Sequence, residues 1–444
     1  MPDGKRRRSR SSSRGHNILG QPVAWLREKN FSGGYWTFFN AAFFYDTGFA
    51  LYWFLFNLYL LDFHFNERAI GLINGALTLG LLAGTLPAGA LGRRFGPRSV
   101  LLFCFTVSPL LNAARVLWIW EPAQIALAFL AGFSMCSWTV TFLPAVSQLT
   151  TKANRTAAIS LIFSIGVGSS ALGGAMCGYL PQWIAHAGFE LQPFATKRLI
   201  LLASCAFAAF GFFPVLRLRM PRGAPDIPPA PNHRAWLRSF HLNPFLGKFI
   251  LCMALWSVIL AGFAPFANVY LSRELRIPLT HIGLIFSLAQ LLQLISGLLV
   301  PVVLRWLGVL NGILATQLAA AITLATMAGI HHQPLAIAFY LAFSASQWMS
   351  SPALYSLLMN ETPEAERSTA AASTMFVNSL VSSGATAAAG VLFTELGYSR
   401  VFLGLAALAA AVAFLCRMLL SQKQERRADG PAPELHPSSL INLD

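Results

Sequence analysis

One acidic side chain, Asp46, lies in the middle of a long apolar stretch, "NAAFFYDTGFALYWFLFN". No other Asp or Glu lies near the centre of an apolar stretch. An ionisable group in such a place is costly and is usually retained for function. If the stretch is helical, the face of Asp46 also carries aromatic, small and polar side chains. They are Phe39, Phe43, Phe49, Ala50, Trp53 and Asn57.

The chemistry that suits this face is the binding of a positive charge. A carboxylate among aromatic rings can bind a lipophilic cation, or a proton that is exchanged for one. The alternative is a carboxyl group that only hydrogen-bonds a neighbouring helix. We favour the binding role for Asp46.

A second group of residues combines arginines with glycines in "PAGALGRRFGPRSVLL", residues 87–102. Gly89 allows close helix approach, and Gly96 permits a tight turn. Arg94 and Arg98 can bind carboxylates, carbonyls at helix ends or lipid phosphates. The charges alone would fit a simple membrane anchor, but the glycines favour a loop that takes part in conformational gating.

Two further arginines lie in similar short sequences, Arg155 in "ANRTAAIS" and Arg367 in "AERSTAAAS". Glu361, Glu364 and Glu366 are close enough in sequence to pair with Arg367 or with a neighbouring loop. Such pairs can hold helix ends together in one state and release them in another. The equally simple alternative is that these charges only terminate apolar segments.

Other polar and aromatic residues in apolar segments are weaker candidates for substrate contacts. Arg115, in "LLNAARVLWIW", lies near the end of its segment, where its side chain can extend to the membrane surface as an anchor. None of the nine histidines lies deep in an apolar segment. The candidates that we add to Asp46, Phe43, Trp53 and Asn57 are Trp138, Trp256, Gln347 and Tyr355.

The composition indicates the environment in which these residues work. Of 444 residues, 55% are hydrophobic and 11% are charged, whereas a soluble domain carries about 25% charged residues. The basic start, "KRRRSRSSSR", resembles a nucleic-acid-binding arm but also suits the cytoplasmic flank of a first membrane span, which we favour. The six cysteines lack the spacing of a metal site. We therefore expect a membrane protein without nucleic-acid partner, metal or cofactor.

Apolar segments long enough to cross a bilayer as helices occur along the whole chain. The twelve predicted spans are 35–61, 69–92, 99–119, 122–147, 157–181, 198–216, 247–271, 279–303, 308–330, 334–358, 368–392 and 399–420. The sequence thus predicts an all-α membrane protein with twelve transmembrane helices.

The distribution of Lys and Arg predicts the orientation of these spans. With twelve spans both termini lie on one side, and that side then carries 25 of the 32 Lys and Arg residues. Cytoplasmic loops carry such an excess. We expect a multi-pass protein of a cell inner (plasma) membrane, with both termini in the cytoplasm.

The chain is also divided into two halves. A polar, proline-rich segment lies between the sixth and seventh spans and is typical of a linker. The predicted parts are a basic tail, 1–33; a six-helix bundle, 34–217; a cytoplasmic linker, 218–246; a second six-helix bundle, 247–420; and a cytoplasmic tail, 421–444.

A repeat supports the two halves. Arg155 and Arg367 lie 212 positions apart, and so do Gly96 of "RRFG" and Gly308 of "RWLG". Equal offsets in separate loops indicate duplication of a six-helix unit, as in transporters that rock around a central site.

The loop at residues 89–98 resembles the signature G-x-x-x-D-R-x-G-R-R/K between helices two and three of the major facilitator superfamily. Gly89, Arg94, Gly96 and Arg98 match it, and Arg93 stands where the family usually has Asp. The resemblance implies two pseudo-symmetric six-helix bundles, with helices one, four, seven and ten lining a central cavity. In the family, the Asp stabilises the outward-open state against a helix N-terminus. Arg93 cannot do this, because a cation is unfavourable there.

The resemblance implies a secondary active transporter that moves a small molecule by alternating access, and not an enzyme. No G-x-x-x-x-G-K-[ST] loop for ATP is present. Because Asp46 has aromatic neighbours, we expect proton-coupled efflux of amphipathic or cationic compounds. The alternatives are proton-coupled uptake of a metabolite and a non-transporting sensor or scaffold with the same fold. The expected partners are a small-molecule substrate, protons and membrane lipids, and we expect a monomer.

Overall fold

The computed structural model describes residues 31–151, 154–188, 192–220, 244–330, 332–363 and 366–428. These residues form helices and short connections, without a β-strand in the described ranges. The all-α fold class is therefore confirmed. Most of the two predicted tails and most of the predicted linker at 218–246 lie outside the described residues, and α15 continues into the predicted C-terminal tail as far as Ala428.

The helices fall into two consecutive sets. The N-terminal set consists of α2 (Gly33–Asp62), α3 (Glu67–Phe95), α4 (Pro97–Leu117), α5 (Glu121–Leu149), α6 (Arg155–His186), α7 (Pro193–Phe210) and α8 (Phe212–Arg217). The C-terminal set consists of α10 (Pro244–Phe263), η1 (Ala264–Phe266), α11 (Ala267–Arg273), α12 (Leu279–Leu307), α13 (Val309–Gly329), α14 (Gln333–Glu361) and α15 (Arg367–Ala428).

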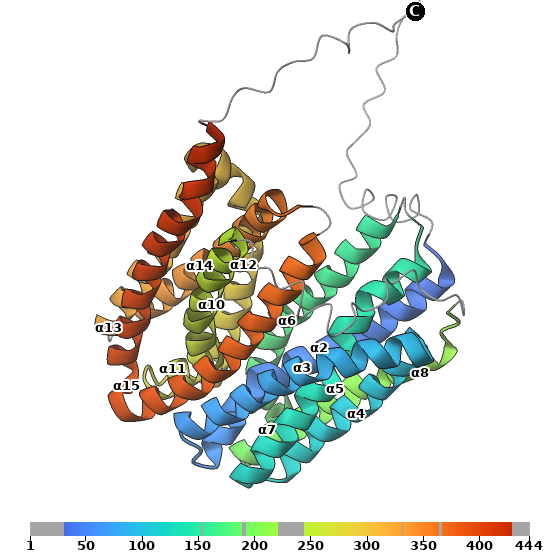
Figure 1. Ribbon diagram of the computed structural model, residues 1–444. Coiled ribbons are helices and arrows are strands. Elements are labelled where there is room, and N and C mark those ends of the chain that lie inside the picture. Colours follow the sequence, from blue (N-terminus) through green and yellow to red (C-terminus); the bar gives the residue numbers. More distant parts are fainter. Residues whose placement is uncertain are drawn as a thin grey trace, which may run out of the picture.

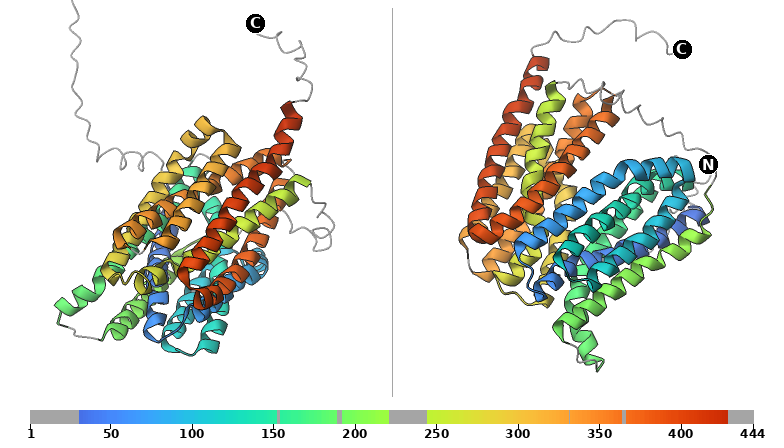
Figure 2. Two further views of the ribbon diagram at one scale, coloured as in Figure 1. Left: turned by 90° about the vertical axis from the view of Figure 1, so that its left-hand side faces the viewer. Right: turned by 60° about the horizontal axis from the view of Figure 1, so that its bottom comes forward.

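Within each set the helices pack side by side, and the two sets meet along two seams. In the N-terminal set, α3 and α4 pack on α5, and α2 packs on α6 and α7. In the C-terminal set, α10 and α13 pack on α15, and α12 packs on α14. The seams are formed by α3 with α15 and by α6 with α12. The two sets converge where α2 leads into α3 and spread apart toward the opposite end (Figures 1 and 2).

The duplicated glycines have the same backbone geometry in both sets. Gly96 joins α3 to α4 with φ 80° and ψ 159°, and Gly308 joins α12 to α13 with φ 75° and ψ 166°. This region of φ and ψ is essentially restricted to glycine. The matching turns support the duplication predicted from the equal offsets.

Most predicted spans correspond to one helix, with three interruptions. Gly211 separates α7 from α8, and the 3₁₀ turn η1 separates α10 from α11. Gly397, with φ 77° and ψ 170°, interrupts α15 at the junction of the last two predicted spans.

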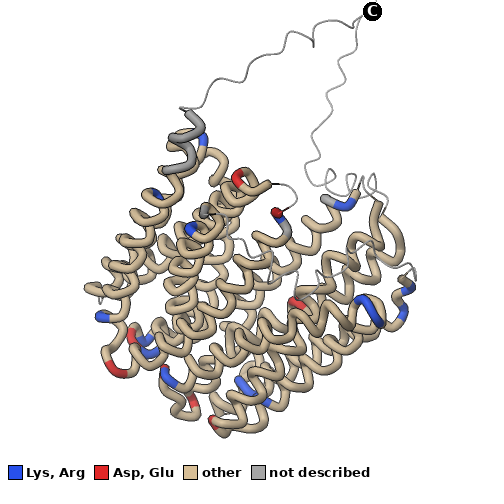
Figure 3. Tube along the Cα trace, in the orientation of Figure 1, with Lys and Arg blue, Asp and Glu red and all other residues tan. Residues whose placement is uncertain are grey.

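Nine helical runs of the described chain are long and apolar enough to cross a membrane, with α15 counted once. The helices α2 and α14 are not among the nine, so the count of twelve spans stays a prediction. Charged residues gather near the ends of the helices, and the middle of the molecule is almost free of them (Figure 3). This distribution fits a multi-pass membrane protein.

Candidate functional site

The carboxyl group of Asp46 lies on α2, is partly buried and interacts with the Trp138 side chain of α5. The Trp138 ring lies 5.7 Å from Phe38 and 5.5 Å from both Tyr45 and Phe105, between ring centroids. Stacked and tilted rings of this kind hold the indole in place. The structure thus brings together two residues that the sequence singled out separately.

Close packing of α2 against α6 and α7 fixes the position of Asp46 in the N-terminal set. A Cβ atom at Gly48 would lie 2.6 Å from the Ser204 carbonyl oxygen, so α2 touches α7 backbone to backbone there. Beside Asp46, Thr47 Oγ1 lies 2.7 Å from Ser169 Oγ of α6, within hydrogen-bonding distance. The carboxyl group is therefore carried by a helix that neighbours hold on both sides.

The other predicted substrate contacts are scattered. The Phe43 ring is 43% exposed and packs at 6.2 Å from Phe207 of α7. Trp53 is partly buried, and Trp256 is buried with an indole nitrogen that has no acceptor among the described residues. On α14, Gln347 is buried and Tyr355 is exposed. Their roles in binding stay predictions.

Asn57 binds the opposite set of helices in this structure. Its Nδ2 atom donates to the Pro265 carbonyl oxygen at 2.8 Å, within the 3₁₀ turn η1. In return, Asn268 Nδ2 of α11 donates to the Phe54 carbonyl oxygen at 3.0 Å. Asn74 Nδ2 supports the arrangement by donating to Asn57 Oδ1 at 3.2 Å. Each of the two amides, Asn57 and Asn268, thus donates to a backbone carbonyl of the other set. We call this pair of hydrogen bonds between α2 and the broken helix α10–α11 the Asn57–Asn268 clasp.

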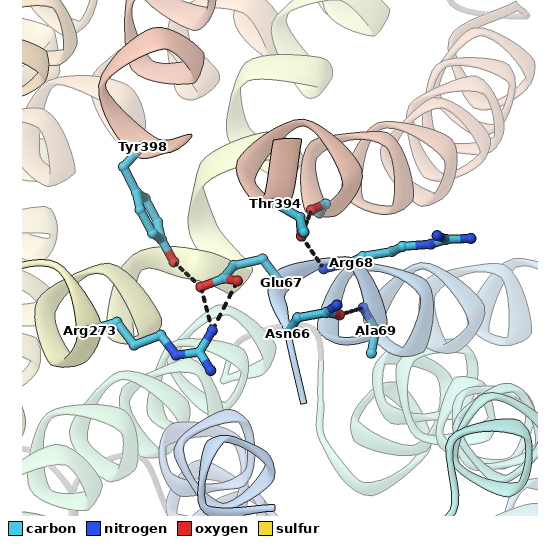
Figure 4. A network of polar contacts seen from close by, with 8 residues as sticks. Asn66, Glu67, Arg68, Ala69, Arg273, Thr394 and Tyr398 are labelled. Atoms are coloured by element: carbon cyan, nitrogen blue, oxygen red, sulfur yellow. Dashed lines mark hydrogen bonds and ion pairs between the residues drawn. The ribbon is translucent and has the colours of Figure 1, made fainter. Parts of the chain in front are cut away.

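A charged network joins the same two sets nearby (Figure 4). Arg273 Nη1 lies 3.0 Å from each carboxylate oxygen of Glu67, and Tyr398 Oη donates to Glu67 Oε1 at 3.1 Å. The backbone N–H of Arg68 donates to Thr394 Oγ1 at 3.0 Å. The side chains of Glu67 and Arg273 are 10% and 40% exposed. We call the end of the molecule that carries this network the closed end.

Small residues let the seams close tightly. A Cβ atom at Gly71 of α3 would lie 2.8 Å from the Thr386 carbonyl oxygen of α15. A Cβ atom at Gly174 of α6 would lie 2.8 Å from the Gly283 carbonyl oxygen of α12. At such distances a larger side chain would push the helices apart, so both seams depend on direct backbone contact.

Sequence reasoning missed the network of Glu67, Arg273 and Tyr398. Glu67 and Arg273 lie at the ends of different apolar segments, where charged residues commonly terminate a span. The sequence did contain one indication of this network: both residues are predicted to lie on the non-cytoplasmic side of the membrane, which is poor in Lys and Arg. Their pairing depends on how two distant helices meet, which spacing along the chain does not encode.

The predicted gating arginines contact carbonyl oxygens within their own sets. Arg98 donates to the Val215 and Leu216 carbonyl oxygens at the end of α8, at 3.3 and 2.5 Å. Arg155 Nη2 donates to Ser147 O at 3.2 Å. Cations at a helix C-terminus stabilise its unpaired carbonyl groups.

The remaining members of the gating group are Gly89, Arg93, Arg94 and Arg367. Arg367 Nε donates to Thr362 O at 3.2 Å, again within its own set. The Arg94 guanidinium lies 5.2 Å from the centroid of the Phe95 ring. A Cβ atom at Gly89 would lie 3.7 Å from Arg93 Nη1, which is ordinary van der Waals contact, and no other helix of the described chain approaches this position closely. A role of these residues in gating stays a prediction.

Comparison with known proteins gives a consistent result. The family model described as "Major Facilitator Superfamily" matches residues 38–386. Comparison with curated protein sequences finds no significant match. Solved structures with a similar fold include a mutant of the nucleoside transporter NupG, with TM-score 0.74 and 14% identity over 87% of this chain and 100% of that chain. A bacterial homologue of the human lysosomal transporter Spinster, in an inward-facing and unoccupied conformation, has TM-score 0.69 and 13% identity over 90% and 100%. A D-xylose–proton symporter has TM-score 0.67 and 13% identity over 86% and 95%.

Proposed function

Because this chain belongs to the major facilitator superfamily of membrane transporters, we propose that it exports an amphipathic or cationic small molecule in exchange for protons. The family and the similar structures are those of transporters and not of enzymes. The substrate class, the direction and the proton coupling are the parts that we propose. They rest on one observation, the Asp46 carboxyl group held against Trp138.

The Asp46 site favours a ligand with one positive charge and apolar bulk. The carboxylate supplies the counter-charge, and the rings around Trp138 supply apolar surface and cation–π attraction. A proton and an organic cation would compete for the same carboxylate. Such competition converts binding into exchange, because one ligand must leave before the other binds.

The movement that carries the ligand is a rocking of the two sets. We propose that residues 34–217 and 247–420 act as the two moving bodies, separated by the linker at 218–246. The closed end would face the outside, because the excess of Lys and Arg assigns the opposite end to the cytoplasm. The site would then be reached from the cytoplasm in this state. We further propose a monomer in the cell inner membrane, with cytoplasmic termini and surrounding lipids.

The test compares wild type with Asp46→Asn in proteoliposomes that carry a proton gradient and a pH-sensitive dye. Lipophilic cations and neutral metabolites serve as substrates. We expect cations to drive proton movement in wild type, and the rate to fall at least about tenfold in Asp46→Asn, because the amide can neither release a proton nor pair with a cation. Glu121→Gln makes the same chemical change on an exposed residue of α5 and should transport normally.

The direction of proton flow separates export from uptake. In exchange, protons and cations move in opposite directions across the vesicle membrane, whereas in symport they move together. Co-directional movement would replace export by proton-coupled uptake. Unchanged transport by Asp46→Asn would remove Asp46 from the mechanism.

A further inference from the structure

Arg115 has no role in the transport mechanism proposed above. The sequence predicted an anchor that extends to the membrane surface, and this prediction is wrong, because the Arg115 side chain is fully buried. Its guanidinium carbon lies 4.3 Å from the centroid of the Phe56 ring and 5.9 Å from that of Tyr52, both on α2. The helix α2 therefore covers the charge that α4 carries.

The buried guanidinium is short of hydrogen-bond acceptors. Arg115 Nη1 donates to Asn112 Oδ1 at 3.0 Å. Within the described part of the chain, no group accepts from Nε or Nη2. The ionisable side chains that interact with the charge are Tyr52 and Cys205, and neither is a carboxylate. Among the residues that the structure describes, no acidic side chain therefore balances this positive charge.

The surrounding groups hold the guanidinium in a fixed place. Gln124 of α5 is fully buried, and its Nε2 atom donates to the carbonyl oxygens of Arg115 and Trp118 at the end of α4. Its Oε1 atom has no donor among the described residues. Tyr52 Oη donates to the Asn112 carbonyl oxygen at 3.2 Å. Unused donors and a fixed cation therefore lie together between α2, α4 and α5.

A buried unpaired charge is strongly disfavoured, and the facing rings offset only part of that penalty. A water molecule could satisfy a donor but would bring no opposite charge. An anion would do both. Because side chains enclose Arg115 completely, only an anion of about halide size suits the place.

We propose that the unpaired Nε and Nη2 donors of Arg115, held in place against the Phe56 and Tyr52 rings, form a binding site for a small monovalent anion of the halide type. Arg115 lies two residues before the end of α4. A bound anion would tie α2, which carries Asp46, to α4 and α5. The site does not depend on the proposed transport function.

The first experiment locates the anion directly. Crystals of the full chain grown or soaked in bromide should show an anomalous peak beside the Arg115 guanidinium. An anomalous map without a peak at that place would overturn the proposal, and a peak only at exposed arginines would do the same.

The second experiment measures thermal stability of the purified full chain in potassium chloride, bromide or gluconate at equal ionic strength. In wild type, chloride and bromide should raise Tm by at least about 2 °C over gluconate, with saturation. Arg115→Met should lose this difference. Arg305→Met, the same change on an exposed residue of α12, should keep it.

A third variant covers the case in which Arg115→Met does not fold. Arg115→Lys keeps a positive charge and should keep a saturable halide response, at a higher midpoint concentration. An equal halide response in wild type and Arg115→Met would contradict the proposal, as would no response in wild type.

Discussion

At the Asp46 carboxyl, we infer that the Trp138 indole in the aromatic cluster of α5 donates a hydrogen bond to the acid of α2. An indole N–H that donates to a carboxylate fixes the orientation of the carboxyl group. Trp138 therefore positions Asp46, whereas the facing rings contribute apolar surface. The two contributions are separable by substitution, since Phe retains the ring and lacks the N–H.

The Trp138→Phe variant tests this positioning role. Loss of a hydrogen bond to a charged group costs about 1.5–3 kcal/mol, so the apparent affinity for a cationic substrate should fall about tenfold or more. Binding titrations across pH check this, because an altered carboxyl group also moves the pH midpoint of binding. Trp183→Phe, on an exposed tryptophan of α6, is the matched control. Unaltered affinity and pH midpoint would show that the bond has no part in binding.

At the scale of elements, the two sets contain the same kind of glycine turn between two consecutive helices, and we call each of these turns a joint. Gly96 and Gly308 permit the abrupt turns between α3 and α4 and between α12 and α13. In the first joint, Arg98 then fixes the start of α4 to the end of α8. Gly96 of the family signature and its counterpart Gly308 thus have a conformational role here, and Arg98 has a helix-capping role.

Alanine substitution tests the two joints. Gly96→Ala and Gly308→Ala should each destabilise the protein by about 1–3 kcal/mol, because a Cβ is strained at these φ and ψ values. The measurement is the free energy of unfolding in a denaturant titration in detergent. Gly297→Ala, in the middle of α12 with open space around a Cβ, should be neutral or stabilise by up to about 1 kcal/mol. Equal effects at all three positions would contradict the assignment.

At the scale of the whole molecule, the closed end is sealed by groups that must separate in any other state. The Asn57–Asn268 clasp and the Glu67–Arg273–Tyr398 network each join the N-terminal and C-terminal sets. In the rocking movement that we propose, these polar groups would lose their partners in the other set and bind water instead. The balance between states therefore depends on how well the network is formed.

Glu67→Gln should shift this balance toward a state that is open at the present closed end. The reporter is Ser383→Cys, which lies in the α3–α15 seam, where Ser383 Oγ donates to the Gly75 carbonyl oxygen. The native cysteines are free and buried, so background labelling by a maleimide should be low. We expect labelling about tenfold faster in Glu67→Gln, since the charged contact of Arg273 Nη1 with both carboxylate oxygens is lost.

The controls separate the charged contact from general loosening. The charge exchange Glu67→Arg with Arg273→Glu should restore slow labelling, whereas either change alone should accelerate it. Glu395→Gln changes an exposed acid of α15 and should have no effect. Fast labelling in the charge-exchanged protein would argue against a direct role of the ion pair.

The sequence by itself determined the helical membrane fold, the family, the repeat and the deeply placed acid at Asp46. The fold, the repeat and the place of the acid follow from composition, segment length and spacing along the chain, whereas the family follows from the resemblance of residues 89–98 to a known signature. Helical spacing also identified the face of α2 that carries Asp46.

Only the tertiary structure decided which faces meet. Trp138 lies 92 positions after Asp46, Arg273 lies 206 positions after Glu67, and Tyr398 lies further still. The burial of Arg115 is likewise a tertiary property. Its place near a segment end predicts exposure, but α2 covers it in the folded chain. A helical period shows that a side chain shares a face with others, but the partner of that face is chosen by the packing of distant helices. That packing depends on close contacts such as those at Gly71 and Gly174, which form only when the whole chain has folded.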